Sequence, residues 1–153
     1  MAMAIDYEGA MREAIAIAVE AKKSGDVPVG AVVLNESGEV IGVGHNLREA
    51  DRDPTAHAEI VAIREAAENL GNWRLDHCTI VVTLEPCGMC AGAIAQSRIS
   101  RVVFGAWDEK AGAVGSVWDL LRDPRAPFTV EVISGVLAAE CAELLTDFFE
   151  SFR

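Results

Sequence analysis

Two short, almost wholly apolar stretches with a helical segment between them constrain the fold of this chain most strongly. The stretches are CTIVVTL at residues 78–84 and RVVFGA at residues 101–106, and PCGMCAGAIAQSR at residues 86–98 separates them. Strands separated by a helix are joined by a crossover connection and pair in parallel. The sequence therefore predicts an α/β protein with a largely parallel sheet covered by helices.

The remaining elements are expected to complete a single domain over residues 1–153. An apolar stripe predicts a helix at 7–23, and two strands flanking the turn at 36–38 predict a β-hairpin at 29–46. Asp53 is a suitable N-cap, and Pro54 a suitable first residue, for a helix that ends before Gly71. We expect one helical turn at 117–121, a strand at 128–134 and a closing helix at 137–152. This order predicts a three-layer α/β/α sandwich with a five-stranded mixed sheet.

Composition favours a well-filled core in a cytoplasmic protein. The hydrophobic content is 51%, yet the apolar runs are too short to span a membrane. The first residues, MAMAIDYEGA, lack the basic and apolar regions of a signal peptide. Four cysteines without an export signal are expected to stay reduced, which makes a disulfide framework a poor explanation for them.

The Cys-x-x-Cys motif at Cys87 and Cys90 predicts part of a metal site. The two residues are one helical turn apart at the start of a helix, so both sulfur atoms can face one point. His57 lies in the opening turn of the helix expected from Pro54, and two helix starts that follow neighbouring strands can meet at one edge of the sheet. One His and two Cys leave the fourth position of zinc open for water, which is typical of a catalytic site. We therefore expect one Zn²⁺ per chain, bound by His57, Cys87 and Cys90.

Glu59 completes the predicted catalytic site. It follows His57 by two residues, about 200° around an ideal helix, so the two side chains do not readily bind one metal ion. A carboxylate beside the metal can carry protons, and zinc lowers the pKa of its water to about 7. Hydrolytic deamination of a ring amidine needs both functions. The joint pattern H-x-E with P-C-x-x-C is the signature of zinc-dependent deaminases.

Two other readings of the cysteine pair remain open at this point. A thioredoxin-like dithiol also lies at a helix start after a strand, but it leaves His57 and Glu59 unexplained. A structural zinc site needs a fourth ligand, and the remaining His and Cys residues are the candidates: His45, His77, Cys78 and Cys141. We expect Cys78 and Cys141 to be core thiols.

Six stretches of the chain resemble the bacterial tRNA-specific adenosine deaminases, which belong to the zinc-dependent cytidine/deoxycytidylate deaminase superfamily. They are VPVGAVV, GHN, DPTAHAEI, LEPCGMCAGAI, SRISRVVFGAWDEKAGAVGS and GVLAAECAELLTDFF. The resemblance extends from about residue 5 to residue 152. It implies a cytidine deaminase-like fold and conversion of the wobble adenosine of a tRNA to inosine, with release of ammonia. It also implies a homodimer that binds the tRNA anticodon loop.

The same resemblance implies roles for individual residues. His57, Cys87 and Cys90 would hold zinc, and Glu59 would shuttle protons. The residues implied to contact the substrate are Val29, Asn46, Ala58, Asp108, Phe148 and Phe149. Asn46 would hydrogen-bond the flipped nucleotide, Val29 would pack on the base, and Ala58 would donate its backbone N–H to the base edge. Asp108 would contact a neighbouring ribose, where a carboxylate accepting from a 2′-OH favours RNA over DNA. Phe148 and Phe149 would lie near the anticodon loop.

The charge of the chain bears on the substrate and not on the reaction. The net charge is −11, and phosphate contacts need Lys and Arg. Where the family commonly has Asn-His-Arg, this chain has Pro127, Phe128 and Thr129. A local basic rim can suffice, and seven basic residues are expected on loops around the site: Arg48, Arg52, Arg98, Arg101, Lys110, Arg122 and Arg125.

Two alternative functions therefore stay open. The first is deamination of a free base or nucleoside, such as cytosine, guanine or cytidine, by the same zinc chemistry. The second is a non-catalytic binding module with structural zinc, against which Glu59 argues because a structural site has no use for a proton carrier.

Overall fold

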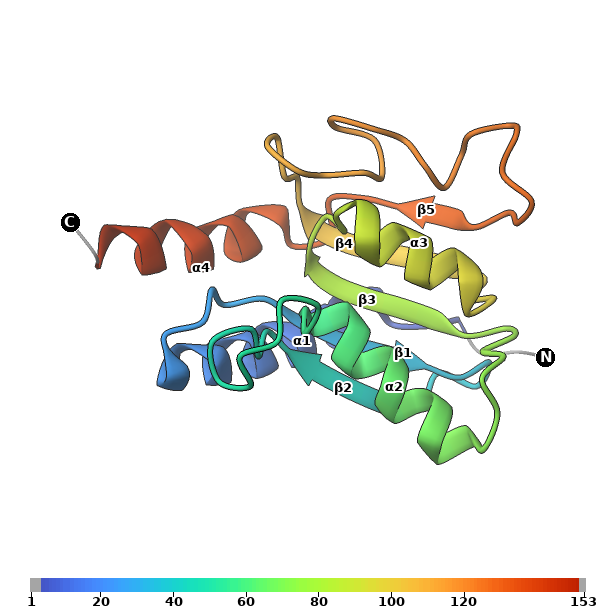
Figure 1. The fold of residues 1–153 in the computed structure, drawn as a ribbon, viewed down its shortest axis with the longest axis horizontal. Coiled ribbons are helices and arrows are strands. Elements are labelled where there is room, and N and C mark those ends of the chain that lie inside the picture. The colour runs from blue at the N-terminus through green and yellow to red at the C-terminus, as the bar shows by residue number, and fades with distance from the viewer. Residues whose placement is uncertain (1–3, 152–153) are drawn as a thin grey trace.

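A five-stranded mixed sheet forms the middle layer of the molecule (Figure 1). The computed structural model describes residues 4–151, so the ends of the predicted domain, 1–3 and 152–153, lie outside the described residues. The strand order is β2-β1-β3-β4-β5. β1 pairs antiparallel with β2 and β3, whereas β3, β4 and β5 are parallel. The strands are β1 (Gly30–Leu34), β2 (Val40–His45), β3 (Thr79–Leu84), β4 (Arg101–Ala106) and β5 (Glu131–Ile133). The predicted sheet is confirmed.

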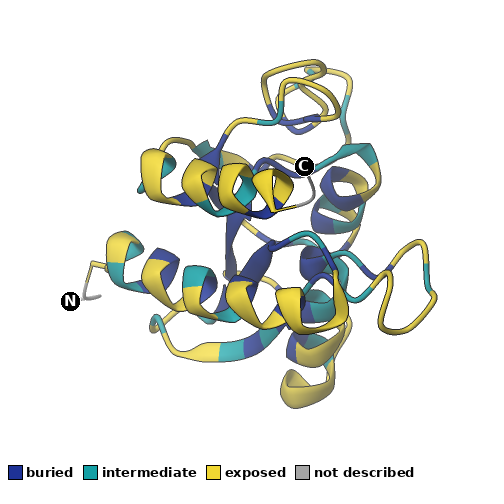
Figure 2. Ribbon diagram, turned by 90° about the vertical axis from the view of Figure 1, so that its left-hand side faces the viewer, coloured by how far each residue is buried: buried dark blue, intermediate teal, exposed yellow. Residues whose placement is uncertain are grey.

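Helices cover both faces of this sheet. The helices are α1 (Tyr7–Glu20), extended by a short 3₁₀ helix η1 (Ala21–Ser24), α2 (Ala58–Leu70), α3 (Gly88–Gln96) and α4 (Ala138–Glu150). α1 and α4 pack on one face, and α2 and α3 pack on the other, with their buried sides turned to the sheet (Figure 2). α4 runs on past the end of the sheet (Figure 1). Within residues 4–151, no helix is both long and apolar enough to cross a membrane.

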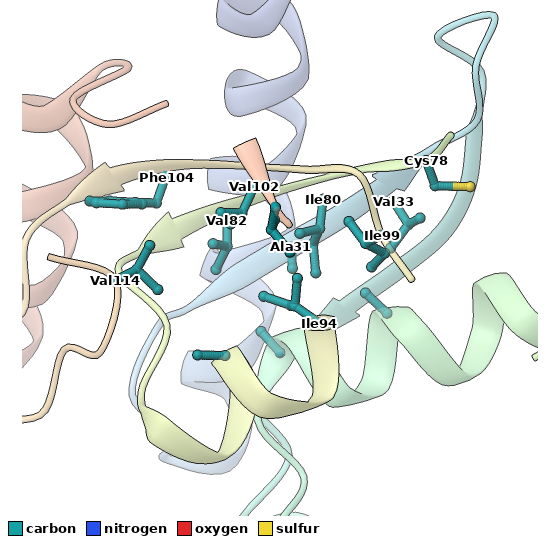
Figure 3. Packing of buried hydrophobic residues seen from close by; sticks show 14 of the residues in the cluster. Ala31, Val33, Cys78, Ile80, Val82, Ile94, Ile99, Val102, Phe104 and Val114 are labelled. Carbon is teal, nitrogen blue, oxygen red and sulfur yellow. The ribbon is translucent and has the colours of Figure 1, made fainter. Parts of the chain in front are cut away.

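Alternation along the strands divides the core into two clusters. In β3, Ile80 and Val82 face α2 and α3, whereas Val81 faces α1 and α4. Figure 3 shows the first cluster, in which Ile80 and Val82 lie with Val102 and Phe104 of β4. Because both faces are covered, β1 and β3 read as nearly continuous apolar runs. The expected core thiols also divide between the clusters: Cys78 lies in the first and Cys141 in the second.

Glycines in β2 let α2 approach the sheet closely. A Cβ on Gly42 would lie 2.8 Å from the Ala66 Cβ, and one on Gly44 would lie 2.6 Å from the Ala62 backbone nitrogen. Neither distance is compatible with a real side chain, so only glycine permits this packing. The close contact fixes the start of α2, and with it His57, against the sheet.

Two local predictions are wrong. The helix expected from Pro54 begins at Ala58, with His57 as its N-cap, because the Asp53 carboxylate accepts hydrogen bonds from the Thr55 N–H and hydroxyl in a separate turn. Its predicted end is correct, since Gly71 closes α2 with a φ of 72°. The helical turn expected at 117–121 is absent, and residues 114 and 119 form an isolated antiparallel bridge within a loop.

Candidate active site

The three predicted metal ligands meet at the starts of two helices. His57 is the N-cap of α2 and Cys87 is the N-cap of α3, with Cys90 one turn further on. The Nδ1 atom of His57 lies 3.6 Å from the Cys87 sulfur and 3.5 Å from the Cys90 sulfur. Neither N-cap side chain accepts a hydrogen bond from its helix. An ordinary cap contributes about 1 kcal/mol, so these positions trade helix stability for ligand placement.

The donor set fits a tetrahedral zinc ion. With Zn–S near 2.3 Å and Zn–N near 2.05 Å, a tetrahedral angle separates nitrogen and sulfur by about 3.6 Å. The two nitrogen–sulfur distances given above agree with this value, and the three ligand atoms all lie within 4.8 Å of one another. Among the described residues, no fourth His, Cys, Asp or Glu joins the group. The arrangement is that of an open site with three protein ligands.

The electrostatics of the cysteine pair favour a thiolate. Hydrogen bonds from Cys90 and from His57 lower the pKa of the Cys87 thiol to about 3, against the effect of burial. The pKa of Cys90 is raised, first because it donates to Cys87 and then because it is buried. The hydrogen bond to Cys87 likewise raises the pKa of His57. Without metal, the three groups therefore share protons that a bound cation would displace.

Glu59 is a buried carboxyl group beside this cluster and outside the group of ligand atoms. Its side chain is only 4% exposed, yet it lines the pocket that leads to His57 and Cys87. Burial raises the pKa of Glu59 to about 7. A group with this pKa accepts and releases protons readily at neutral pH, which is what a general acid–base catalyst requires.

A pocket of about 210 Å³ lies in front of the cluster. Four of the predicted substrate-contacting residues line it together: Val29, Asn46, Ala58 and Asp108. The Asn46 amide donates to the Val27 carbonyl and accepts from the Arg48 N–H, which holds its orientation. Oδ1 of Asp108 accepts two backbone N–H groups of its own loop, and Oδ2 has no partner among the described residues. The volume is below the 300–1,000 Å³ typical of drug-sized ligands and suits a single flat group.

Phe148 and Phe149 lie outside this pocket, along two hollows that adjoin it. One hollow, of about 330 Å³, is lined by Asp26, Arg48 and both phenylalanines. The other, of about 490 Å³, is lined by Trp107, Lys110, Leu145 and Phe149. Both hollows share Val27 with the central pocket. A ligand longer than one base can therefore extend from the pocket into the adjoining hollows.

Two buried carboxylates that the sequence reasoning missed hold the loops around the pocket. Glu85 accepts the N–H groups of Asp108, Val114 and Ser116 at 2.9–3.1 Å. Asp26 accepts those of Glu49 and Ala50, next to Arg48. In both, burial raises the pKa but the hydrogen bonds outweigh it and lower the pKa below its ordinary value. An acidic residue next to an apolar strand run, as in Leu84-Glu85, was the available signal.

Only part of the predicted basic rim lies at the site. Arg48 lines the pocket and Lys110 lines the larger hollow. The placement predicted for Arg98 and Arg101 is wrong, because Arg101 pairs with Thr79 at the start of β3, whereas the pocket follows Leu84 at its end. The Arg98 guanidinium lies 3.6 Å from the Phe128 ring centroid. Phe128, one of the residues that departs from the family pattern, therefore packs on Arg98 and lines neither the pocket nor the hollows beside it.

Comparison with known proteins identifies the family. The model of the cytidine and deoxycytidylate deaminase zinc-binding region matches residues 5–106. The tRNA-specific adenosine deaminase of Haemophilus influenzae is 51% identical over 146 residues, 95% of this chain and 84% of that protein. The chain belongs to the tRNA-specific adenosine deaminase family. The Bacillus subtilis member is 49% identical over 143 residues, 94% of this chain and 88% of that protein.

The fold agrees with this family. A solved structure from a study of A-to-I editing by tRNA:A34 deaminases at the wobble position of transfer RNA superposes with a TM-score of 0.86. The two chains are 42% identical, and the superposition covers 90% of this chain and 99% of the solved chain. Membership in a deaminase family excludes the thioredoxin-like reading of Cys87 and Cys90.

Proposed function

We propose that this chain is a single-domain, zinc-dependent enzyme that deaminates the wobble adenosine of tRNA to inosine and releases ammonia. The observation that carries the proposal is the buried Glu59 carboxyl group, which lines the pocket beside a three-ligand metal site. The family membership supports the substrate, and the two hollows beside the pocket offer room for neighbouring nucleotides. A cytoplasmic location is part of the proposal, because the enzyme would meet its tRNA substrate there.

The chemistry follows from the groups around the pocket. His57, Cys87 and Cys90 would hold zinc, which supplies Lewis-acid activation of water when it is bound. Glu59 accepts a proton from the attacking water and passes it to the base as the new bond forms at carbon 6. The carbon–nitrogen bond to the amino group then breaks, and ammonia leaves with the second proton. Water enters and ammonia departs, so no oxidant or reductant is needed.

The remaining pocket residues would bind and orient the adenosine. Val29 and Ala58 form apolar and backbone walls for the base, and Asn46, held by Val27 and Arg48, keeps one amide N–H for the nucleotide. The Oδ2 atom of Asp108 is available to a ribose 2′-OH. Asp108→Asn is therefore expected to weaken the preference for RNA over the matching DNA. An unchanged ratio of the two activities would remove Asp108 from this role.

The direct test is inosine formation in an arginine tRNA with an ACG anticodon. Zinc-loaded wild-type protein is expected to form inosine at the wobble base. Glu59→Gln, which keeps the size of the buried side chain, is expected to retain zinc and fold and to lose more than about 100-fold in rate. Loss of zinc from this variant would make Glu59 a ligand and contradict its role. Ammonia release from guanine or cytidine, without inosine in tRNA, would favour the free-base alternative.

A homodimer is the expected assembly, and one surface suits it. Large apolar side chains stay exposed on the first turn of α3, at Met89, and on the loop that follows β4, at Val117, Trp118 and Leu120. An isolated bridge between Cys87 and Gly112 joins this loop to the start of α3. Exposed apolar groups gathered in one region mark interaction surfaces. Leu120→Asp is expected to shift the protein toward monomer in sedimentation. A dimer that persists in both Leu120→Asp and Trp118→Asp would place the interface elsewhere.

A further inference from the structure

Trp107 is held half-exposed in the larger hollow beside the active pocket, hereafter the side groove, which is lined by Trp107, Lys110, Leu145 and Phe149. The indole is 47% exposed. Its ring meets the buried Phe104 edge to face, with the centroids 4.9 Å apart and the planes at 82°. On another side it is confined by Gly115, where an added Cβ would lie 3.0 Å from the indole Cζ3 atom. The ring is therefore fixed in orientation while one surface stays open to the groove.

The side groove is continuous with the active pocket. Val27, Leu84, Asp108 and Ala111 line both hollows. This shared wall gives a strand whose adenosine enters the pocket a route into the side groove. Trp107 lines the part of this groove next to the shared wall residue Asp108.

The chemistry of the groove matches an unpaired nucleotide. Bases stack on aromatic rings whatever their sequence, and a ring fixed beforehand loses little freedom on binding. Lys110 supplies a cation for the connecting phosphate, while Asp108 and Glu109 oppose a ligand with further negative charge. A free base that fills the central pocket would use neither Trp107 nor Lys110, because both line the side groove and not the pocket.

We infer that Trp107 is a stacking platform for one of the two nucleotides adjacent to the reactive adenosine, so that this residue helps to select RNA chains over free bases. The inference rests on the proposed function and names a substrate contact that the function alone does not require. Stacking on an aromatic side chain contributes enough affinity that its removal lowers binding by about 5- to 150-fold per base.

The test compares Trp107→Ala with Trp73→Ala on an RNA stem-loop that carries the ACG anticodon. Trp73 is a matched control because it is also exposed and contacts cations, but it lines neither the pocket nor the side groove. Trp107→Ala is expected to lower kcat/KM by about 5- to 150-fold, mainly through KM, while Trp107→Phe keeps most of the activity and Trp73→Ala stays within about twofold. Equal activity of Trp107→Ala and Trp73→Ala would overturn the inference and leave the deaminase function standing.

A second arm identifies the base and does not depend on turnover. Two stem-loops, each with an abasic site on one side of the adenosine, are compared for their binding affinity to wild type and to Trp107→Ala. At one of the two positions, the abasic site is expected to abolish the difference in stem-loop affinity between wild type and Trp107→Ala. A difference in affinity that is kept at both positions would overturn the inference. In a Glu59→Gln protein with Trp73 and Trp118 replaced by Phe, binding of the intact stem-loop is expected to quench Trp107 fluorescence. This signal is read even if no inosine forms, and unchanged fluorescence on saturated binding would refute stacking.

Discussion

Replacing Glu85 by Gln tests whether a single buried carboxylate holds the loop that carries Asp108. The substitution keeps the size of the side chain, so it opens no cavity. Glu85 is 2% exposed and accepts three backbone N–H groups, one on Oε1 and two on Oε2. An amide has one acceptor oxygen and must turn its NH₂ group toward at least one of these donors.

The expected cost follows from these contacts. One buried N–H left without an acceptor costs about 1–3 kcal/mol. The remaining hydrogen bonds lose their charge assistance, which makes them about half as strong. Since the hydrogen bonds outweigh burial in setting the pKa of Glu85 below its ordinary value, the charged form is the stabilised one. We expect Glu85→Gln to lower the free energy of unfolding by about 3 kcal/mol, which is about 6–12 °C in Tm for a chain of this size.

Thermal unfolding at pH 7 measures this effect, and hydrogen exchange at Val114 and Ser116 locates it in the loop. Glu36→Gln is the matched control, because it removes the same charge from an exposed position in the hairpin turn. A Tm of Glu85→Gln within about 2 °C of that control would refute the role of the carboxylate. Loss of exchange protection spread evenly over the sheet would mean that the variant disturbs the whole fold instead.

The same carboxylate predicts a dependence on pH. The folded pKa of Glu85 lies below the ordinary value of 4.5, so its contribution is complete above about pH 5 and is lost as the pH falls through the folded pKa. The difference in Tm between wild type and Glu85→Gln should therefore be constant from pH 8 to about pH 5 and shrink below that. A gap that stays constant into the most acidic range in which both proteins fold would contradict this assignment.

Two other predictions concern the metal and the packing of α2. Removal of zinc with a chelator should lower Tm, because a metal that is bound only by the folded chain stabilises that chain. It should also abolish inosine formation. Calorimetry with and without zinc measures the change in Tm, and equal unfolding transitions would exclude a bound metal. Gly42→Ala should destabilise the protein by about 1–3 kcal/mol because its Cβ meets that of Ala66, whereas Gly92→Ala, with open space in α3, should stabilise it by up to about 1 kcal/mol. Chemical unfolding of both variants checks this, and similar midpoints would contradict the close approach of α2.

The residues of the His57, Cys87 and Cys90 group were predictable because the sequence information is local. His57 and Glu59 are two residues apart, Cys87 and Cys90 are three apart, and each pair opens a helix after a strand. The strand order was not derivable from the sequence pattern. The expectation that the two helices follow neighbouring strands is wrong, because α2 follows β2 and α3 follows β3, and β1 lies between these strands. Short spacings therefore identify the residues at the centre of the site, whereas the sheet order that brings the two helix starts together comes only from the structure.

The loops around the pocket were not predictable in the same way. Glu85 binds N–H groups 23 to 31 residues further along the chain, and no spacing rule links such partners. Residues 117–121 do not form the expected helical turn because their backbone bonds back to this loop: the Val117 and Trp118 N–H groups donate to the Gly112 carbonyl, and the Leu120 N–H donates to the Ala113 carbonyl. The start of α2 was misjudged at Asp53 because the true N-cap, His57, breaks the usual capping preference. Functional sites are where such local rules are expected to fail.

The acidic charge of the chain leads to a last prediction about RNA binding. Among the residues that line the pocket and its two adjoining hollows, the Lys and Arg residues are Arg48 and Lys110, whereas the net charge of the whole chain is −11. Charges interact over about 30 Å at 0.01 M salt but only about 10 Å at 0.1 M, so repulsion from the rest of the molecule dominates at low salt and fades first. The two local contacts lose affinity more slowly, with a slope near −1.4 in log K against log salt for a single strand. Affinity for the anticodon stem-loop should therefore pass through a maximum at intermediate salt, and Arg48→Ala should flatten the descending limb by about 0.7. A steep, linear decline from the lowest salt onward would mean that many phosphates are bound, and that the basic surface extends well beyond these two residues.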